Sequence, residues 1–235
     1  PIKLISLIMN DYFETGKDKI YIYDLDGTLW DERANSKGKA VGSENMNLFS
    51  GLIHSGNNYE HVRNVFKYLY HQDKEIQIYS DFGNIHFTSS DYNKRIISDT
   101  YIVNPEVKIE LETVDLFRGK VVNRGEGSVV TIKPLVNREV LMQIASNCLQ
   151  KFDGLYVAKI SGHTSIDITH KDYDKKTMIQ EILKEQRLGV SDVIFVGNET
   201  IEGAEATIAD LGIKTIQVDD VYECNMLLKT INSQW

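Results

Sequence analysis

A short apolar run at residues 20–25 ends in an acidic turn, and this feature constrains the fold more than any other in the chain. Apolar runs that stop at a charged turn are typical of buried parallel strands, so we expect a core strand that ends at a sheet edge. Asp24 and Asp26 stand two positions apart there, and such residues face the same side of a strand. Paired carboxylates suit a hard cation such as Mg²⁺, and one of them can act as a nucleophile. The alternatives are an acidic turn, a helix cap or a calcium loop, although the preceding strand disfavours a helix-loop-helix.

Strands and helices alternate in the first and last parts of the sequence. Residues 31–58 are rich in Asn, Ser, Gly and charge, and they predict a long irregular excursion whose role the sequence does not reveal. A helix is expected at 59–70 from its three- and four-residue apolar spacing, with strands at 76–80 and 101–103. Later in the chain the expected elements are helices at 175–187 and 201–211, strands at 193–197 and 213–218, and a last helix through Met226 and Leu227.

The pattern changes between residues 106 and 170. Short, partly alternating segments predict strands there, beginning with KIELETV at 108–114, and a helix is expected at 138–152. The predicted fold class is therefore α/β, with a discontinuous parallel-sheet core at residues 1–105 and 171–235 that is interrupted by an α+β cap domain at 106–170.

The run Y-I-Y-D-L-D-G-T-L resembles motif one of the haloacid dehalogenase (HAD) superfamily of phosphohydrolases. In that family the first aspartate is the nucleophile that becomes an aspartyl-phosphate, and the second is the general acid/base. The resemblance assigns these roles to Asp24 and Asp26. It also implies a Rossmann-like core and Mg²⁺ as the cofactor.

Two further positions follow the order of the family motifs. The family pattern asks for a Ser or Thr at the end of the next core strand, and Ser80 is matched to it, with Asp81 beside it as a candidate substrate-binding residue. A serine at a strand end is otherwise an ordinary turn residue. Lys175 precedes a helix as the lysine of motif three does, where an ammonium neutralises phosphate and nucleophile. Lys176 competes for that role, and a solvated helix start is the alternative.

The fourth motif departs from the family pattern, because Asn198 stands after Gly197 where the family has an aspartate. An amide oxygen can bind a hard cation but adds no charge, so the affinity for Mg²⁺ should fall unless a glutamate compensates. The resemblance implies the metal ligands Asp24, Asp26 and Asn198, and the candidate compensating residues are Glu199, Glu202 and Glu205. Alternatively, Asn198 caps the following helix.

The position of the insert resembles the C2-capped HAD proteins, among them Cof-type sugar phosphatases, sucrose-phosphate phosphatases and phosphomannomutases. Their caps supply specificity groups, so Arg118, Arg124 and His163 are candidate substrate contacts, although such side chains are more often just solvated. The resemblance implies a phosphatase that acts on a small phosphorylated metabolite, with a sugar phosphate as the first expectation. A phosphomutase and a catalytically weakened phospholigand-binding protein are the alternatives.

Composition disfavours several other classes of protein. The 26 Lys+Arg and 34 Asp+Glu give a net charge of -8 without a basic run, so no nucleic-acid partner is expected. Two cysteines without zinc spacing fit a reducing compartment. The apolar residues 1–9 are too few to span a bilayer, so we expect a docked amphipathic segment, no membrane partner and a cytoplasmic location. The sequence leaves the oligomeric state open.

Overall fold

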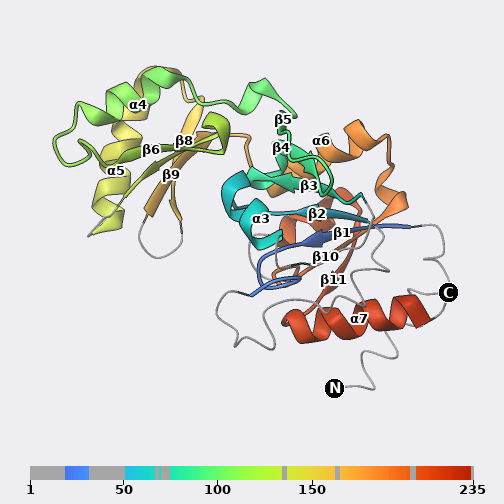
Figure 1. Ribbon diagram of the computed structural model, residues 1–235. Coiled ribbons are helices and arrows are strands. Elements are labelled where there is room, and N and C mark those ends of the chain that lie inside the picture. Colours follow the sequence, from blue (N-terminus) through green and yellow to red (C-terminus); the bar gives the residue numbers. More distant parts are fainter. Residues whose placement is uncertain are drawn as a thin grey trace. The chain divides into compact units, whose positions relative to one another are not determined.

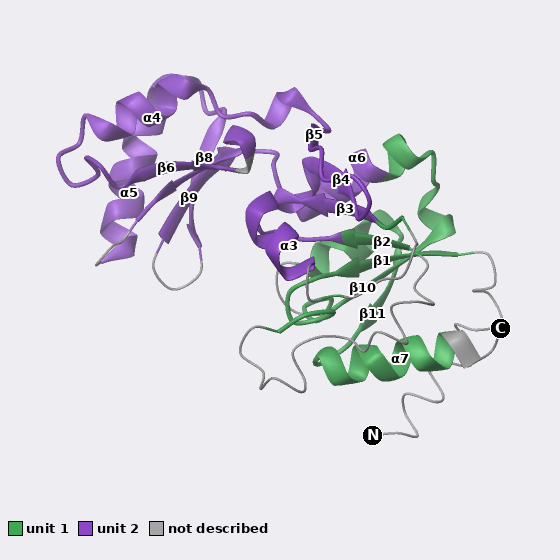
Figure 2. Cartoon of the chain, in the orientation of Figure 1, with its two compact units in different colours: residues 1–53, 69–76, 183–235 green, residues 54–68, 77–182 purple. Residues whose placement is uncertain are grey.

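The computed structural model describes most of the chain, and its strands and helices are drawn in Figure 1. The described residues are 19–31, 51–66, 69, 75–133, 137–161, 165–201 and 205–233. They belong to two compact units, coloured separately in Figure 2. Unit 1 comprises residues 1–53, 69–76 and 183–235, and unit 2 comprises residues 54–68 and 77–182.

Unit 1 contains buried strands of the core sheet. They are β1 (Ile20–Asp24), β2 (Gly51–His54, whose last residue belongs to unit 2), β10 (Val193–Gly197) and β11 (Lys214–Gln217), in the order β11-β10-β1-β2. β10 pairs in parallel with both β1 and β11, and Ile22 lies opposite Phe195. Both of these side chains are fully buried. The strands predicted at 20–25, 193–197 and 213–218 are confirmed.

Two helical segments of unit 1 follow these strands. The 3₁₀ helix Ala206–Leu211 occupies part of the helix predicted at 201–211, and α7 (Val221–Ser233) is the predicted last helix. Cys224 and Leu228 are buried on α7, four residues apart, as one apolar face of an amphipathic helix requires. Cys224 therefore has the buried role expected for a cysteine outside any metal-binding pattern.

Unit 2 begins with α3 (Tyr59–Phe66), which confirms the start of the helix predicted at 59–70. Three strands of the core sheet follow: β3 (Gln77–Ser80), β4 (Ile85–Thr88) and β5 (Arg95–Ile96), which pair antiparallel in this order. β3 is the strand predicted at 76–80, whereas β4 and β5 were not predicted. α6 (Lys175–Gln186, whose residues from 183 onward belong to unit 1) confirms the helix predicted at 175–187.

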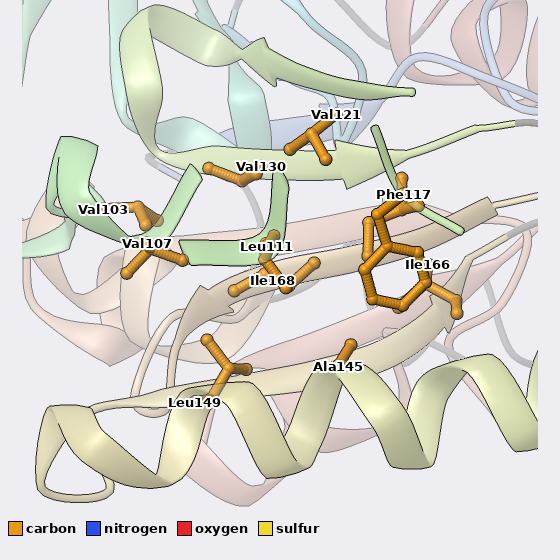
Figure 3. Close-up of a cluster of buried hydrophobic side chains, with 11 residues drawn as sticks. Val103, Val107, Leu111, Phe117, Val121, Val130, Ala145, Leu149, Ile166 and Ile168 are labelled. Carbon is orange, nitrogen blue, oxygen red and sulfur yellow. The ribbon is translucent and has the colours of Figure 1, made fainter. Parts of the chain in front are cut away.

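A separate antiparallel sheet of four strands also lies in unit 2. Its strands are β6 (Val121–Arg124), β7 (Val129–Ile132), β8 (Tyr156–Ser161) and β9 (Ser165–His170), in the order β6-β7-β9-β8. Helices α4 (Pro105–Glu112) and α5 (Arg138–Leu149) share one hydrophobic cluster with this sheet. Figure 3 shows Leu111 of α4 and Ala145 of α5 close to Ile166 and Ile168 of β9. The opposite face of the sheet carries the alternating residues Thr131 and Asp167.

The segment 108–114 is not the strand that its alternation predicted, because residues up to 112 belong to α4. Val107 and Leu111 are buried and Ile109 is 66% exposed, so the apolar spacing that matters is four residues rather than two. Asn104 caps the helix by accepting a hydrogen bond from the Glu106 amide at 2.9 Å, and Pro105 occupies its first position.

Two other expectations were wrong. Residues 101–103 form no strand: the 3₁₀ helix Asp99–Tyr101 precedes an extended residue, and β3 pairs with β4 instead. The excursion predicted at 31–58 contains β2, which is only four residues long and follows a polar stretch. The remaining residues 32–50 lie outside the described residues.

These elements confirm an α/β fold class with a mostly parallel core sheet and a separate α+β segment. The four antiparallel strands fall between residues 121 and 170, inside the predicted cap, while its boundaries at 106 and 170 stay a prediction. Within the described ranges, no helix has the length and apolar character needed to cross a bilayer. His163, Glu202 and residues 1–9 lie outside the described residues.

Candidate active site

Asp24 ends β1 and is only 3% exposed. The parallel register pairs Tyr23 with Val196, so the next position along the ladder places Asp24 beside Gly197. Because the carboxyl ends of parallel strands meet at one edge of the sheet, the loop after β10 starts where the Asp24 carboxylate lies. Unit 1 thus brings motif one close to Gly197 and to the start of the loop after β10, which we call the Gly197 corner.

Gly27 and Asn198 make the closest approach between these two loops. Gly27 has φ +86°, and a Cβ built on it would come 2.6 Å from Asn198 Nδ2. The turn is closed by the Leu25 carbonyl, which accepts hydrogen bonds from the amides of Leu29 and Trp30 at 2.9 Å. Glycine is required here both by the left-handed backbone and by the asparagine side chain that occupies the space of a Cβ. Asn198 therefore packs on the turn that carries Asp26.

Glu205 is the described glutamate that lies nearest this corner. It is 1% exposed, and one of its carboxylate oxygens, Oε2, occupies the space that a Cβ on Gly197 would need. The same oxygen accepts a hydrogen bond from the Glu199 amide at 3.2 Å. The Glu199 side chain is exposed, so of these two glutamates Glu205 is better placed to add negative charge at the end of β10.

The oxygen donors at this corner fit a hard cation. Asp24 supplies a buried carboxylate, and Asn198 supplies an amide against the turn of Asp26. The described residues contain no group of three or more His, Cys, Asp and Glu side chains arranged to hold a metal. The amide oxygen of Asn198 and main-chain carbonyls are further oxygen ligands that a hard cation accepts.

In unit 2, Lys175 is the first residue of α6, and its side chain lies over Gly56. Its Cε would be 3.7 Å from a Cβ built on Gly56. Asp174 caps the helix by accepting a hydrogen bond from the Thr177 amide at 2.8 Å, which fixes the point where Lys175 enters the helix. Lys176, the competing lysine, is likewise partly exposed.

His54 is fully buried close to Lys175. Burial, together with the positive charge of Lys175, lowers the pKa of His54 to about 3, so its imidazole is neutral at pH 7. Its Nε2 lies 2.7 Å from the Phe82 carbonyl oxygen, which can only accept, so Nε2 carries the proton. The sequence analysis missed this histidine because it stands in the stretch predicted to be irregular.

Ser80 ends β3 as predicted, but its hydroxyl is bound within the protein. Oγ donates to the carbonyl oxygen of Ile85 at 3.4 Å and lies 3.5 Å from Asp81 Oδ2. Asp81 is also buried, its Oδ2 accepts a hydrogen bond from the Tyr59 amide at 3.1 Å, and burial raises its pKa to about 6. The roles of Ser80 in catalysis and of Asp81 in substrate binding stay predictions.

Ser55 is a second candidate hydroxyl that the sequence analysis missed. β2, not β3, is the neighbour of β1 in the strand order, and Ser55 follows β2 directly. Its amide donates to the Tyr79 carbonyl at 2.8 Å, and its Oγ accepts from the Asn57 amide at 3.0 Å. The family pattern asks for a hydroxyl after the next core strand, so the strand order favours Ser55 over Ser80. The signal in the sequence was a Ser-Gly pair after the short apolar run GLIH.

The predicted cap residues differ in their surroundings. Arg124 Nη1 lies 3.4 Å from Asp167 Oδ2, and both side chains are mostly buried. Thr131 donates to the other oxygen of the same carboxylate at 2.6 Å. Arg118 instead pairs with Asp115 at 2.8 Å on an exposed surface. Arg124 thus belongs to an ordered polar group, whereas Arg118 is a solvated ion pair of small energetic weight.

Comparison with known proteins identifies a family. Residues 38–201, more than half of the chain, match the family described as haloacid dehalogenase-like hydrolase. The matched stretch begins after β1, so Asp24 and Asp26 lie outside it. No curated protein matches the chain significantly.

Solved structures with the same fold include enzymes that act on phosphate esters. An IMP-bound IMP-nucleotidase of Plasmodium falciparum has a TM-score of 0.58 and 12% identity, over 93% of this chain and 69% of that chain. The sucrose-phosphatase of Synechocystis sp. PCC6803, in complex with sucrose and phosphate, has a TM-score of 0.57 and 11% identity, over 93% of this chain and 88% of that chain. A haloacid dehalogenase-like hydrolase of Bacteroides thetaiotaomicron has a TM-score of 0.64 and 13% identity, over 92% and 100%. At these identities the similarity establishes a shared fold.

Proposed function

The chain belongs to the haloacid dehalogenase-like hydrolases, and on this premise we propose that it is a Mg²⁺-dependent phosphatase of small phosphorylated metabolites. The observation that carries the proposal is the buried carboxylate of Asp24 at the end of β1, beside the corner where Asn198 packs on Gly27. In open parallel sheets, substrates bind at the carboxyl ends of the strands, where loops from several strands converge. A buried acidic group at this edge is therefore in a position to react with a bound substrate.

Asp24 is the nucleophile of this proposal. One of its carboxylate oxygens attacks phosphorus in line, the bond from phosphorus to the leaving oxygen breaks, and an aspartyl-phosphate forms. Asp26 gives a proton to the leaving oxygen and later takes one from the water that hydrolyses the aspartyl-phosphate. Phosphate then departs and Asp24 is regenerated.

Positive charge and hydrogen-bond donors offset the charge of the transferring group. The Lys175 ammonium and a serine hydroxyl take this role, with Ser55 preferred to Ser80 because it follows the strand next to β1. Asp24, Asp26 and Asn198 would hold Mg²⁺, which supplies Lewis-acid stabilisation of the phosphoryl oxygens when bound. Ser55→Ala and Ser80→Ala, measured side by side, distinguish the two hydroxyls.

The substrate class we propose first is a sugar phosphate. Arg124, Thr131 and Asp167 form a polar group on the sheet face opposite the hydrophobic cluster, and such donors and acceptors suit a hydroxylated molecule. The similar folds belong to a protein in complex with sucrose and phosphate and to one bound to IMP, so nucleoside monophosphates are the second class to examine.

Hydrolysis of an aryl phosphate with and without Mg²⁺ tests the reaction, and a panel of sugar phosphates and nucleoside monophosphates tests the substrate. Asp24→Asn, purified in the same way, is the control for contaminating phosphatases. The proposal is wrong if wild-type protein and Asp24→Asn release phosphate at the same rate from every compound of the panel.

One observation favours a second function. The neutral Asn198 replaces the acidic residue of the family pattern, which favours a protein that binds a phospholigand with weakened or no turnover. Saturable binding of a phosphorylated compound without phosphate release would support this alternative. Conversion of a sugar phosphate to its isomer without net phosphate release would instead identify a phosphomutase.

A further inference from the structure

Three consecutive residues after β3 have left-handed backbone, and two of them are not glycine. The φ angles of Asp81, Phe82 and Gly83 are +53°, +55° and +111°. A left-handed conformation costs a residue with a side chain about 1–2 kcal/mol, so two in succession persist only where surrounding contacts hold them. We name residues 81–83 the left-handed turn.

Side chains from two other segments hold the carbonyls of this turn. His54, at the end of β2, donates from Nε2 to the Phe82 carbonyl oxygen at 2.7 Å. Tyr173, which precedes α6, donates from its hydroxyl to the Asp81 carbonyl oxygen. Both donors are buried, so solvent does not compete for them. The Asp81 carbonyl also accepts a hydrogen bond from the Asn84 amide at 3.1 Å, so the Tyr173 hydroxyl is its second donor.

The left-handed turn makes two contacts near Lys175, both through the Phe82 ring. The Phe82 ring and the Lys175 side chain lie over the same glycine: a Cβ built on Gly56 would be 3.3 Å from Phe82 Cε1 and 3.7 Å from Lys175 Cε. The Phe82 ring also packs edge-on against the ring of Tyr173, two residues before Lys175, at a centroid distance of 5.6 Å. The turn therefore contacts both the side-chain environment of Lys175 and the chain that leads to it.

We propose that His54 and Tyr173 are positioning residues for Lys175, which act by holding the left-handed turn so that Phe82 and Gly56 fix the lysine side chain. This inference rests on the role of Lys175 in the proposed phosphatase. The neutral state of His54 fits it, because a protonated imidazole beside Lys175 would repel the ammonium that it helps to place.

His54→Leu and His54→Gln form the central comparison. Leucine removes the hydrogen bond and keeps an apolar side chain, whereas glutamine can place an amide N–H near the position of Nε2. We expect His54→Leu to lower kcat on an aryl phosphate by about 10- to 100-fold, as small misplacements of catalytic groups do, with KM changed less than about threefold. His54→Gln should keep most of the wild-type kcat, and Tyr173→Phe should resemble His54→Leu.

Two controls separate positioning from a general loss of structure. His86→Leu removes the hydrogen bonds of another histidine, 2.6 Å to Gln77 Oε1 and 3.2 Å to Arg95 Nη2, on β4, and should leave kcat unchanged because neither partner belongs to residues 81–83 or to α6. In a Lys175→Met background, His54→Leu should lower the residual kcat no further, since residues that act as a unit are non-additive. Equal kcat in wild type and His54→Leu, or an additive effect in that background, overturns the proposal.

Hydrogen exchange supplies a readout that does not depend on activity. We expect His54→Leu to increase exchange both at residues 81–84 and at the first turn of α6, while His54→Gln and His86→Leu leave both segments protected. If the wild type hydrolyses no phosphate ester, the proposed function fails. The exchange rates at residues 81–84 and at the first turn of α6 then show by themselves whether His54 holds the turn and the start of α6 together. If the wild type is active and exchange at α6 does not respond to His54→Leu, the positioning role fails and the proposed function stands.

Discussion

The side chain of Asn198 occupies the space that a Cβ of Gly27 would need, with Nδ2 only 2.6 Å from that position. This contact joins the turn after β1 to the loop after β10 in unit 1. A single added methyl group at residue 27 would therefore disturb both loops that carry the candidate metal ligands.

Gly27→Ala should cost stability and activity together. Alanine at φ +86° costs about 1–2 kcal/mol for the left-handed backbone, and the clash with Asn198 adds to this cost. The matched control is Gly154→Ala, since Gly154 has φ +68° and no atom within 4 Å of its Cβ position. Urea unfolding should show a larger loss for Gly27→Ala than for Gly154→Ala, and only Gly27→Ala should lose phosphatase activity. If Gly27→Ala and Gly154→Ala lose the same stability, the Asn198 side chain can move away from residue 27 at little cost in free energy.

Asp24→Asn should abolish turnover because the amide that replaces the carboxylate is not a nucleophile. The side chains have nearly the same shape, so the variant should fold, with an unchanged circular dichroism spectrum. Release of phosphate from an aryl phosphate is the measurement. A rate like that of wild type would exclude the covalent mechanism.

Asp26→Asn should leave binding intact and slow hydrolysis by about 100-fold or more, as the loss of a positioned acid/base does. Rapid quenching should show phosphorylated protein whose breakdown is slow, because the residue that activates water is missing. Unaltered kcat in Asp26→Asn would assign the acid/base role to another residue.

Asp81 should make the unfolding free energy depend on pH. Burial raises its pKa from 3.8 to about 6 in the folded protein, so the folded state prefers the protonated carboxyl. The stabilising contribution is complete below the ordinary pKa and is lost as the pH rises through about 6. Asp81→Asn should therefore gain on the order of 2 kcal/mol relative to wild type between pH 4 and pH 7.

Thermal unfolding at a series of pH values measures this difference. Asp115→Asn, on an exposed ion pair with Arg118, is the control and should show no comparable trend. A constant difference between Asp81→Asn and wild type across this range would contradict the shifted pKa.

The sequence predicted those parts of the fold that depend on long apolar runs. β1 and β10 are continuous and buried, so the limits of β10, and those of β1 to within one residue, followed from the apolar runs in the sequence. The two-residue spacing of Val107, Ile109 and Leu111 is that of a strand, and only packing shows that Ile109 faces solvent while Val107 and Leu111 lie on one helix face. The helix start at Asn104 and Pro105 was the overlooked signal.

The candidate site was less predictable, because it depends on short segments and on unusual backbone. β2 has four residues and ends beside Ser55, so the hydroxyl that the strand order favours lay in a stretch without apolar periodicity. The left-handed conformations of Asp81 and Phe82 run against local preference and require contacts with His54 and Tyr173. Such contacts join residues far apart in the sequence, so no local sequence pattern predicts them.

Asn198→Asp should strengthen the binding of Mg²⁺. Asn198 packs on the turn of Asp26 and follows the strand beside Asp24, so a carboxylate there adds a full negative charge to the donors at this corner. The Mg²⁺ concentration for half-maximal activity should fall about 10-fold or more, and Mg²⁺ should raise the melting temperature at lower concentrations than in wild type.

The glutamates provide the matched comparison for this metal site. Glu205 is buried behind Gly197, whereas Glu199 is exposed, so Glu205→Gln should raise the required Mg²⁺ concentration and Glu199→Gln should leave it nearly unchanged. If Asn198 only caps the segment that follows β10, Asn198→Asp will keep the cap and leave the titration unmoved. An unmoved titration in an active, Mg²⁺-dependent protein would show that the cation lies away from the Gly197 corner. Its ligands would then have to come from other groups around Asp24.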